Sequence, residues 1–173
     1  RADLPDFVRW FADAETTRHL ALRAPFSLAM EEKWFEGLLQ RQGTSDYHFV
    51  ACLVEDGRAI GTVGLHGVDR ENGKAEFGIS IGEKDVWNRG YGTEALRAIC
   101  DFGFGALRLE RIELEVYVDN SRALKCAREA VAGGAAGAVS AVLVSGGVVP
   151  AVTRGACEEG LLEPTGMLMR AAS

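Results

Sequence analysis

The sequence lacks several features that would define its class at once. No apolar run of about 20 residues appears before residue 131 without a glycine or polar interruption, and no secretory signal opens the chain, so we expect a cytoplasmic protein with no membrane contact. Its four cysteines show no metal-type spacing, which favours buried free thiols over a metal site. His19, His48 and His66 are isolated from one another in the sequence, and we expect ordinary core or surface histidines.

Negatively charged residues are in modest excess over positively charged ones. The 25 acidic and 19 basic residues give a net charge of −6, which argues against nucleic acid as the main partner and mildly favours cationic substrates. A solvated acidic surface explains the same charge equally well. With 47% hydrophobic residues, the 173-residue chain can bury a core of its own. We expect a single domain over residues 1–173, and a homodimer is an open possibility.

The most informative segment is a basic, glycine-spaced turn, W-N-R-G-Y-G-T-E-A, at residues 87–95. Gly90 and Gly92 remove the Cβ atoms that would keep a ligand away from the backbone, so successive N–H groups can converge on one anion. The apolar residues that follow continue at helical spacing, and a helix N-terminus favours negative charge. Arg89 adds a full positive charge. Two spaced glycines alone usually make only a turn, so the interpretation depends on the flanking elements.

Strands flank this turn and its helix. Residues 75–81 alternate apolar with small or polar side chains, which is the period of a half-buried strand. Residues 111–118 alternate again and lead into residues 119–123, which are typical of a turn that caps another helix. A dinucleotide-binding fold needs its glycine turn in the first strand-helix unit, and a nucleotide-triphosphate loop needs Gly-Lys-Ser/Thr. The sequence has neither arrangement.

The chain before this region predicts two helices and three strands. The first helix is expected from Leu4 to about Ala14, with Asp3 as N-cap and Pro5 in the first turn. A second helix follows Ser27 and carries on one side Met30, Trp34, Leu38 and Leu39. Strands are expected at residues 47–54, 59–65 and 75–81, the first two joined by a hairpin turn at residues 55–57.

This order of elements, with these residues, resembles the GNAT superfamily of acyl-CoA-dependent N-acyltransferases, and most closely its ribosomal-protein and polyamine acetyltransferase branch. The resemblance runs from about Asp3 to Ala130 and rests on A-E-F at residues 75–77, the glycine turn, T-E-A at residues 93–95, and Asn120 followed by R-A. It implies an α/β (α+β) fold: a mixed, mainly antiparallel sheet of six to seven strands flanked by helices, with a splayed central strand pair. Residues 1–4 resemble the tail of the family's first strand.

The resemblance also implies the reaction and the cofactor site. An amine attacks the thioester carbonyl of acetyl-CoA without a metal ion, and the amine is a polyamine, a protein N-terminus or an amino-group small molecule. The backbone of one short strand segment is implied to pair with the pantetheine arm, while Asn120 holds the amide arm. The implied cofactor-binding residues are Ile79, Ser80, Ile81, Trp87, Asn88, Arg89, Gly90, Tyr91, Gly92, Thr93, Asn120 and Arg122.

Glu76 is the candidate proton acceptor, acting directly or through water. Strand alternation puts its side chain on the face opposite Phe77, and a carboxylate near the acyl group also attracts a cationic amine. A solvated residue on a polar face is an equally good interpretation. Glu113, Glu115 and Tyr117 share the polar face of the next strand and carry the same ambiguity. The catalytic candidates are therefore Glu76, Asn120 and Tyr117.

The sequence departs from the family at one catalytic position. The family's thiolate-protonating tyrosine corresponds here to Ala127, which cannot donate a proton. Either Tyr117 or water then protonates the thiolate, or turnover is weak. An acyl-CoA-binding protein with weak or lost transferase activity is therefore the alternative function.

The sequence departs further from about residue 131. Residues 131–156 consist almost entirely of Val, Ala and Gly, with Arg154 as the only charge. A hairpin of residues 138–144 and 148–153 is the favoured interpretation. An insertion is the second, because residues 157–162 resemble the family's sequence beyond a missing corner, and a slipped reading frame after Ala130 is the third.

Overall fold

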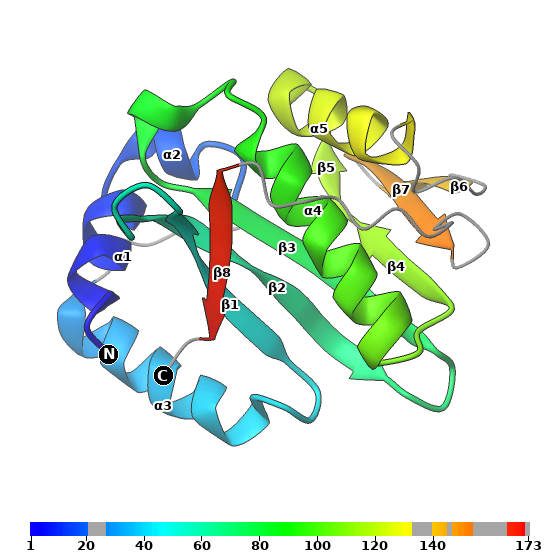
Figure 1. Ribbon diagram of the computed structural model, residues 1–173, viewed down its shortest axis with the longest axis horizontal. Helices are drawn as coiled ribbons and strands as arrows, with labels where there is room; N and C mark the ends of the chain where they lie inside the picture. The colour runs from blue at the N-terminus through cyan, green and yellow to red at the C-terminus, as the bar shows by residue number, and fades with distance from the viewer. Residues whose placement is uncertain (21–26, 133–139, 145–146, 154–165, 172–173) are drawn as a thin grey trace.

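Helices near the N-terminus precede a run of strands in a computed structural model that describes residues 1–20, 27–132, 140–144, 147–153 and 166–171 (Figure 1). The helices are α1 (Leu4–Phe11), α2 (Ala14–Thr17), α3 (Leu28–Arg41), α4 (Tyr91–Asp101) and α5 (Ser121–Ala132), with one-turn elements η1 (Lys84–Val86) and η2 (Phe102–Ala106). The strands are β1 (Tyr47–Leu53), β2 (Ala59–Asp69), β3 (Lys74–Ile81), β4 (Arg111–Leu114), β5 (Val116–Tyr117), β6 (Ser140–Val144), β7 (Gly147–Thr153) and β8 (Met167–Ala171).

One sheet holds all of these strands. Its order is β5-β7-β4-β3-β2-β1-β8, with β6 paired to β7, and every pair is antiparallel except β3 with β4. β4 and β5 pair with β7 in one continuous register, so they form a single strand that is interrupted at Glu115. Counted this way, the described residues make seven strands. The predicted mixed, mainly antiparallel sheet flanked by helices is confirmed.

Helices cover both faces of the sheet, and each face has its own core (Figure 1). On one face Leu96 of α4 belongs to a buried cluster that includes Phe77 of β3. On the other face Trp10 of α1 and Phe35 of α3 belong to a cluster with Val50 of β1. Successive residues of a strand point to opposite faces, which explains why a single strand can contribute to both cores.

The buried face of α3 differs from the prediction. Ser27 begins the helix as expected, and its side chain accepts a hydrogen bond from the backbone N–H of Met30. The apolar side named from the sequence comprised Met30, Trp34, Leu38 and Leu39, whereas the structure buries Glu31, Phe35 and Leu38. The helix carries apolar residues on two faces, and contact with α1 and β1 selects the one spaced i, i+4, i+7. Burial raises the pKa of the Glu31 carboxyl.

The N-terminal helix is also shorter than predicted. It ends at Phe11, and α2 follows with Asp13 as its N-cap. Pro5 lies in the first turn of α1 as expected, but Asp3 does not cap this helix with its side chain. The Asp3 carboxylate instead accepts a hydrogen bond from Nη2 of Arg170, at 2.6 Å.

A strand from the far end of the chain completes the sheet beside β1. Residues 1–4, which resembled the tail of the family's first strand, form no strand in the structure, and α1 already begins at Leu4. β8 pairs antiparallel with β1, from Phe49 opposite Ala171 to Leu53 opposite Met167. Oε1 of Glu94 in α4 accepts a hydrogen bond from the backbone N–H of Met167 at 3.2 Å, which fixes the start of β8 against the helix.

The hairpin expected in the unusual C-terminal segment is present. β6 and β7 pair antiparallel, with Val144 opposite Gly147 and Ser140 opposite Ala151. Of the predicted hairpin, residues 138–139 and 145–146 lie outside the described residues. So do residues 157–162, on which the insertion interpretation depends.

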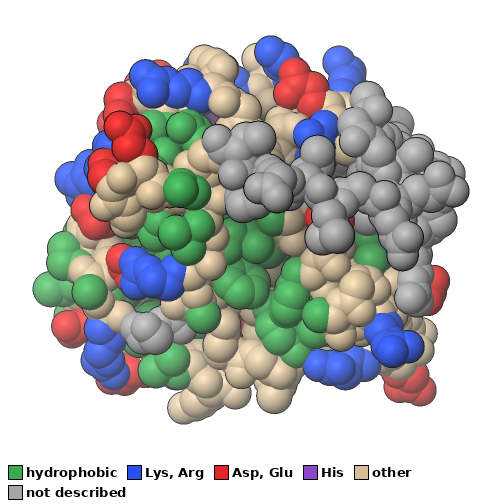
Figure 2. Space-filling view, in the orientation of Figure 1, with side chains coloured by type: hydrophobic (Ala, Val, Ile, Leu, Met, Phe, Trp, Pro, Cys, Tyr) green, Lys and Arg blue, Asp and Glu red, His purple; other side chains and the backbone are tan. Residues whose placement is uncertain are grey.

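The surface seen in Figure 2 separates apolar from charged groups. Hydrophobic side chains gather around the middle of this view, between β8 and α4, while charged side chains lie mainly near the rim. Among the described helices, none has the length and hydrophobicity that crossing a membrane requires.

Candidate active site

The centre of the sheet opens between β3 and β4. These parallel strands pair only from Lys74 opposite Arg111 to Phe77 opposite Leu114. Beyond that point β3 pairs with β2 alone, and β5 pairs with β7 alone. The splayed strand pair that the sequence resemblance implied is therefore confirmed.

One edge of β3 faces this opening. The backbone N–H of Gly82 donates to the carbonyl of Ile60, and the indole N–H of Trp87 donates to the carbonyl of Ile81 at 2.8 Å. Peptide groups alternate in direction along a strand, so the backbone of Ile79 and Ile81 points toward the opening. The peptide groups of Ser80 point toward β2.

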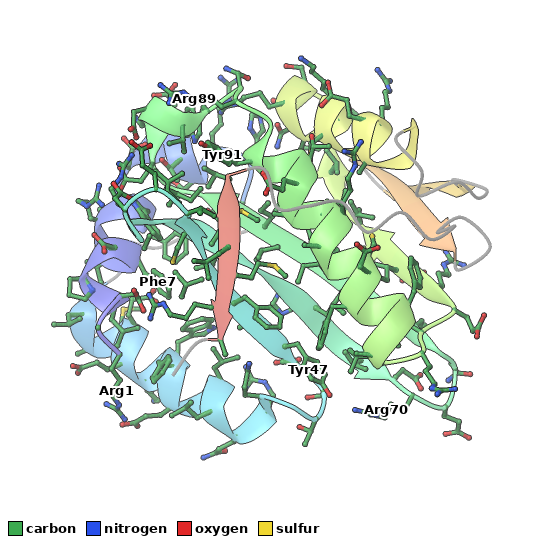
Figure 3. All side chains as sticks on the ribbon, viewed as in Figure 1. Arg1, Phe7, Tyr47, Arg70, Arg89 and Tyr91 are labelled. Carbon is green, nitrogen blue, oxygen red and sulfur yellow. The ribbon has the colours of Figure 1, made fainter. Side chains whose placement is uncertain are left out.

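A cavity of about 610 Å³ fills the opening and continues along the glycine turn. It is lined by nearly all of the residues that the sequence singled out. Those residues are Glu76, Ile79, Ser80, Ile81, Trp87, Asn88, Gly90, Tyr91, Gly92, Thr93, Tyr117, Asn120 and Arg122. Among the predicted cofactor-binding and catalytic residues, Arg89 does not line the cavity, and its side chain is exposed. Figure 3 places Arg89 near the outer edge of the molecule and Tyr91 beside the start of α4.

The glycine turn leaves the N-terminus of α4 without a side-chain cap, so that an anion could approach its backbone N–H groups. Asn88 and Gly90 adopt positive φ angles of 62° and 90°, a conformation that costs glycine little. Gly90 is the N-cap and offers no side chain to the first helical turn. Gly92 faces α5: a Cβ atom there would lie 3.4 Å from Sγ of Cys126. The first N–H groups of α4 therefore line the cavity with the positive end of the helix dipole.

Two predicted cofactor residues contact each other at the side of this turn. The guanidinium carbon of Arg122 lies 3.7 Å from the centroid of the Trp87 ring, a cation–π contact. Trp87 is itself held by its hydrogen bond to Ile81. The stack therefore carries positive charge next to the uncapped helix end.

The predicted catalytic residues meet at the cavity from two strands and a loop. Glu76 on β3 is exposed, and Glu115 and Tyr117 line the cavity from the other side of the opening. Glu113 does not line the cavity; its carboxylate pairs with Arg111 at 2.8 Å. Of the three polar-face residues that were ambiguous in sequence, two reach the cavity and one does not.

Asn120, which is expected to hold the amide arm of the cofactor, also caps helix α5. Its side-chain oxygen accepts a hydrogen bond from the backbone N–H of Ala123 at 3.1 Å, so it caps α5. The amide nitrogen of the same side chain keeps its two hydrogens for a ligand. The cap thus orients the amide at the cavity wall.

The structure adds residues that the sequence did not identify. Thr16, His19 and Leu20, from α2 and the turn after it, line the cavity. The His19 ring lies beside Tyr117, with ring centroids 6.5 Å apart. His19 and Tyr117 are about 100 positions apart in the chain, so no local sequence pattern could have connected them.

Helix α5 runs unbroken through the position of the missing tyrosine. Ala127 is 6% exposed and lines the cavity, so no phenol is present there. Its neighbour Cys126 also lines the cavity, and burial raises the pKa of its thiol. The shift favours the thiol over the thiolate, which is the nucleophilic form.

Two histidines taken as isolated in the sequence form a pair. Nε2 of His48 on β1 lies 3.0 Å from Nδ1 of His66 on β2. Burial lowers the pKa of His48 from its ordinary 6.5 to about 4, and the charge of His66 acts in the same direction. Burial also lowers the pKa of His66, while Asp46 and Glu76 oppose that shift. The pair is therefore neutral at pH 7.

We expect stability to fall on acidification because of this pair. The pKa of His48 is lower in the folded than in the unfolded chain, so the unfolded chain takes up the proton first as pH drops through 6.5. The loss should reach about 2 to 3 kcal/mol by pH 4.5 and be absent above pH 7. Urea unfolding of wild type and His48→Gln across this range measures it. An identical pH dependence in the variant would contradict the assignment.

Comparisons with known proteins agree with this geometry. The model of the acetyltransferase (GNAT) domain family matches residues 1–130. An uncharacterized N-acetyltransferase p20 of Bacillus licheniformis is 32% identical over 120 residues, covering 68% of this chain and 66% of that protein. An L-amino acid N-acetyltransferase of Escherichia coli is 35% identical over 98 residues, covering 55% and 57%. The chain thus matches less than two thirds of the length of these relatives.

Solved structures share the fold at low sequence identity. A spermidine N-acetyltransferase from Vibrio cholerae, in complex with CoA and spermine, superposes with a TM-score of 0.76 at 19% identity, covering 90% of this chain and 92% of the other. An aminoglycoside acetyltransferase, AAC(6')-Ib, in complex with coenzyme A gives 0.70 at 20% identity, covering 90% and 91%. Since the family model also spans well over half of the sequence, this chain belongs to the GNAT acetyltransferase family.

Proposed function

We propose that this protein is an N-acetyltransferase that transfers the acetyl group of acetyl-CoA to a primary amine on a cationic small molecule. The observation that carries the proposal is the single cavity that joins the helix N-terminus of α4 to the carboxylates beside the splayed strands. An anion site, a strand edge that pairs with no other described strand and an acidic end follow one another along it. The three parts suit the diphosphate, the pantetheine arm and an ammonium group respectively.

The residues present fit coenzyme A. Gly90 leaves the end of α4 without a side-chain cap, and the stacked Arg122 adds charge for phosphate oxygens. The backbone of Ile79 and Ile81 and the side chain of Asn120 face the opening from its two sides. When bound, acetyl-CoA supplies an activated acetyl thioester. Among the described residues no group of three or more His, Cys, Asp or Glu is placed to hold a metal ion.

Glu76 is the proposed proton acceptor for the incoming amine. It lies at the cavity beside the point where β3 and β4 separate. A carboxylate there attracts an ammonium group and takes its proton, directly or through water, to leave a nucleophilic nitrogen. Glu115 across the opening adds a second negative charge. This acidic end favours polyamines or aminoglycosides over amino acids, whose own carboxylate would be repelled.

A thiol-release assay with a panel of amines tests the proposal. We expect acetyl-CoA to yield free coenzyme A with spermidine or an aminoglycoside, and much less with a free amino acid or a peptide N-terminus. Mass spectrometry should find the acetylated amine as the second product. If no amine in the panel releases thiol although coenzyme A binds by calorimetry, the protein is instead a binding protein. The alanine at position 127 is the observation that favours that second function.

A further inference from the structure

A histidine and a carboxylate meet at the wall of the cavity. Nε2 of His19, just after α2, lies 3.3 Å from Oδ2 of Asp119, in the turn between β5 and α5. His19 lines the cavity and Asp119 does not. Since Nε2 is engaged by the carboxylate, Nδ1 is the ring nitrogen that remains for a ligand.

The surroundings of this pair keep the imidazole shielded and the carboxylate in solvent. The side chain of His19 is 17% exposed and that of Asp119 is 58% exposed. Arg18 approaches the same carboxylate oxygen at 3.8 Å. Tyr117 flanks the ring at a centroid distance of 6.5 Å. Asp119 directly precedes Asn120 in the chain, so the imidazole is held beside the residue proposed to orient the pantetheine arm.

Acetylation removes two protons from an ammonium nitrogen. The first makes the nitrogen nucleophilic, and Glu76 is proposed to take it. The second must leave as the nitrogen–carbon bond forms, and one carboxylate that has just been protonated cannot take it as well. A second proton acceptor at the same cavity removes this proton without waiting for the exposed Glu76 to release the first one to solvent.

We propose that His19 is this second acceptor and a catalytic residue of the transfer. Its Nδ1 takes the proton as the nitrogen–carbon bond forms, and the resulting imidazolium is stabilised by Asp119 through Nε2–H. His19 then gives the proton to the sulfur as the carbon–sulfur bond breaks. One carbon–nitrogen bond forms and one carbon–sulfur bond breaks. One of the two protons moves from nitrogen to sulfur through His19, and the other leaves the exposed carboxyl of Glu76 for solvent, so no other reactant is needed. Asp119 acts through His19 and is a positioning residue.

Chemical rescue in the full-length chain tests this inference, which rests on the proposed function. His19→Ala should lower kcat on the order of 10²-fold with the wild-type affinity for coenzyme A. Imidazole added to the assay should restore part of the rate, because it can occupy the space that the ring leaves at the cavity wall. His48→Ala removes a histidine outside the cavity, and imidazole should not change its rate. Asp119→Asn should lower kcat by about tenfold with little change in KM.

A second readout does not depend on turnover. The ¹⁵N signals of the His19 ring should move when spermidine is added to wild-type protein without an acetyl donor, because the amine approaches Nδ1. If His19→Ala does not fold, His19→Gln, which cannot accept and release a proton in this way, takes its place in the kinetic test.

The outcomes separate this inference from the proposed function. Acetylation by wild type together with an unchanged rate in the His19 variants would overturn the role of His19 and leave the function in place. A lost rate that imidazole does not restore, with unmoved ¹⁵N signals, would also overturn it. If the wild-type protein acetylates no amine, both the proposed function and the role of His19 are overturned.

Discussion

A Gly92→Val variant should lose coenzyme A binding on the order of 100-fold or more, equivalent to about 2.8 kcal/mol. A Cβ atom added at this position would lie 3.4 Å from Sγ of Cys126 on α5. The two γ-carbons of valine then have to displace Cys126 or turn the first residues of α4 away from the cavity. Either movement misaligns the N–H groups that are proposed to hold the diphosphate.

Isothermal titration calorimetry with coenzyme A measures this loss. Gly92→Ala should show a smaller effect, since one carbon at 3.4 Å needs only a slight shift of the sulfur. Gly105→Val is the matched control, because a Cβ atom there meets nothing within 4 Å and the residue does not line the cavity. An unchanged dissociation constant in a folded Gly92→Val variant would remove the diphosphate site from this turn.

Replacing Glu76 with glutamine should reduce kcat on the order of 10²-fold while coenzyme A affinity stays nearly constant. Glutamine keeps the shape of the side chain but can neither take a proton nor attract an ammonium group. Because part of the effect is lost attraction of the cation, KM for the amine should rise as well.

Glu113→Gln is the control for this second experiment. Glu113 sits opposite Glu76 in the register of β3 and β4, yet it pairs with Arg111 and does not line the cavity. Its substitution should leave the steady-state rate close to that of wild type. If Glu76→Gln and Glu113→Gln have equal rates, Glu76 is a solvated surface residue and not the proton acceptor.

Much of the proposed cofactor site could be predicted because its residues lie in continuous segments. The glycine turn, the strand before it and Asn120 each carry a local pattern, and the structure brings them to one cavity. Arg89 was the exception, since its position in the turn says nothing about where its long side chain points. Glu113 and Glu115 could not be separated either, because alternation assigns a face but not a distance from the opening.

The features that were missed depend on contacts between distant segments. His19 meets Asp119 only after the segment following α2 has packed beside the turn after β5, and His48 meets His66 only after β1 and β2 have paired. The face of α3 was predicted wrongly because Trp34 is apolar but packs edge-on against His48, with ring centroids 5.5 Å apart, instead of entering the core. Periodicity identifies a helix more reliably than it identifies which of two apolar stripes is buried.

The pairing of β8 with β1 has a consequence for how the protein is made. More than 100 residues separate these two neighbouring strands in the chain. At roughly 5 to 20 residues per second, the ribosome needs on the order of 5 to 25 seconds between them. During that time the outer edge of β1 has no partner from β8 and can pair with other chains. Folding of this sheet therefore finishes only after β8 has been synthesised, and until then the outer edge of β1 is exposed to other chains.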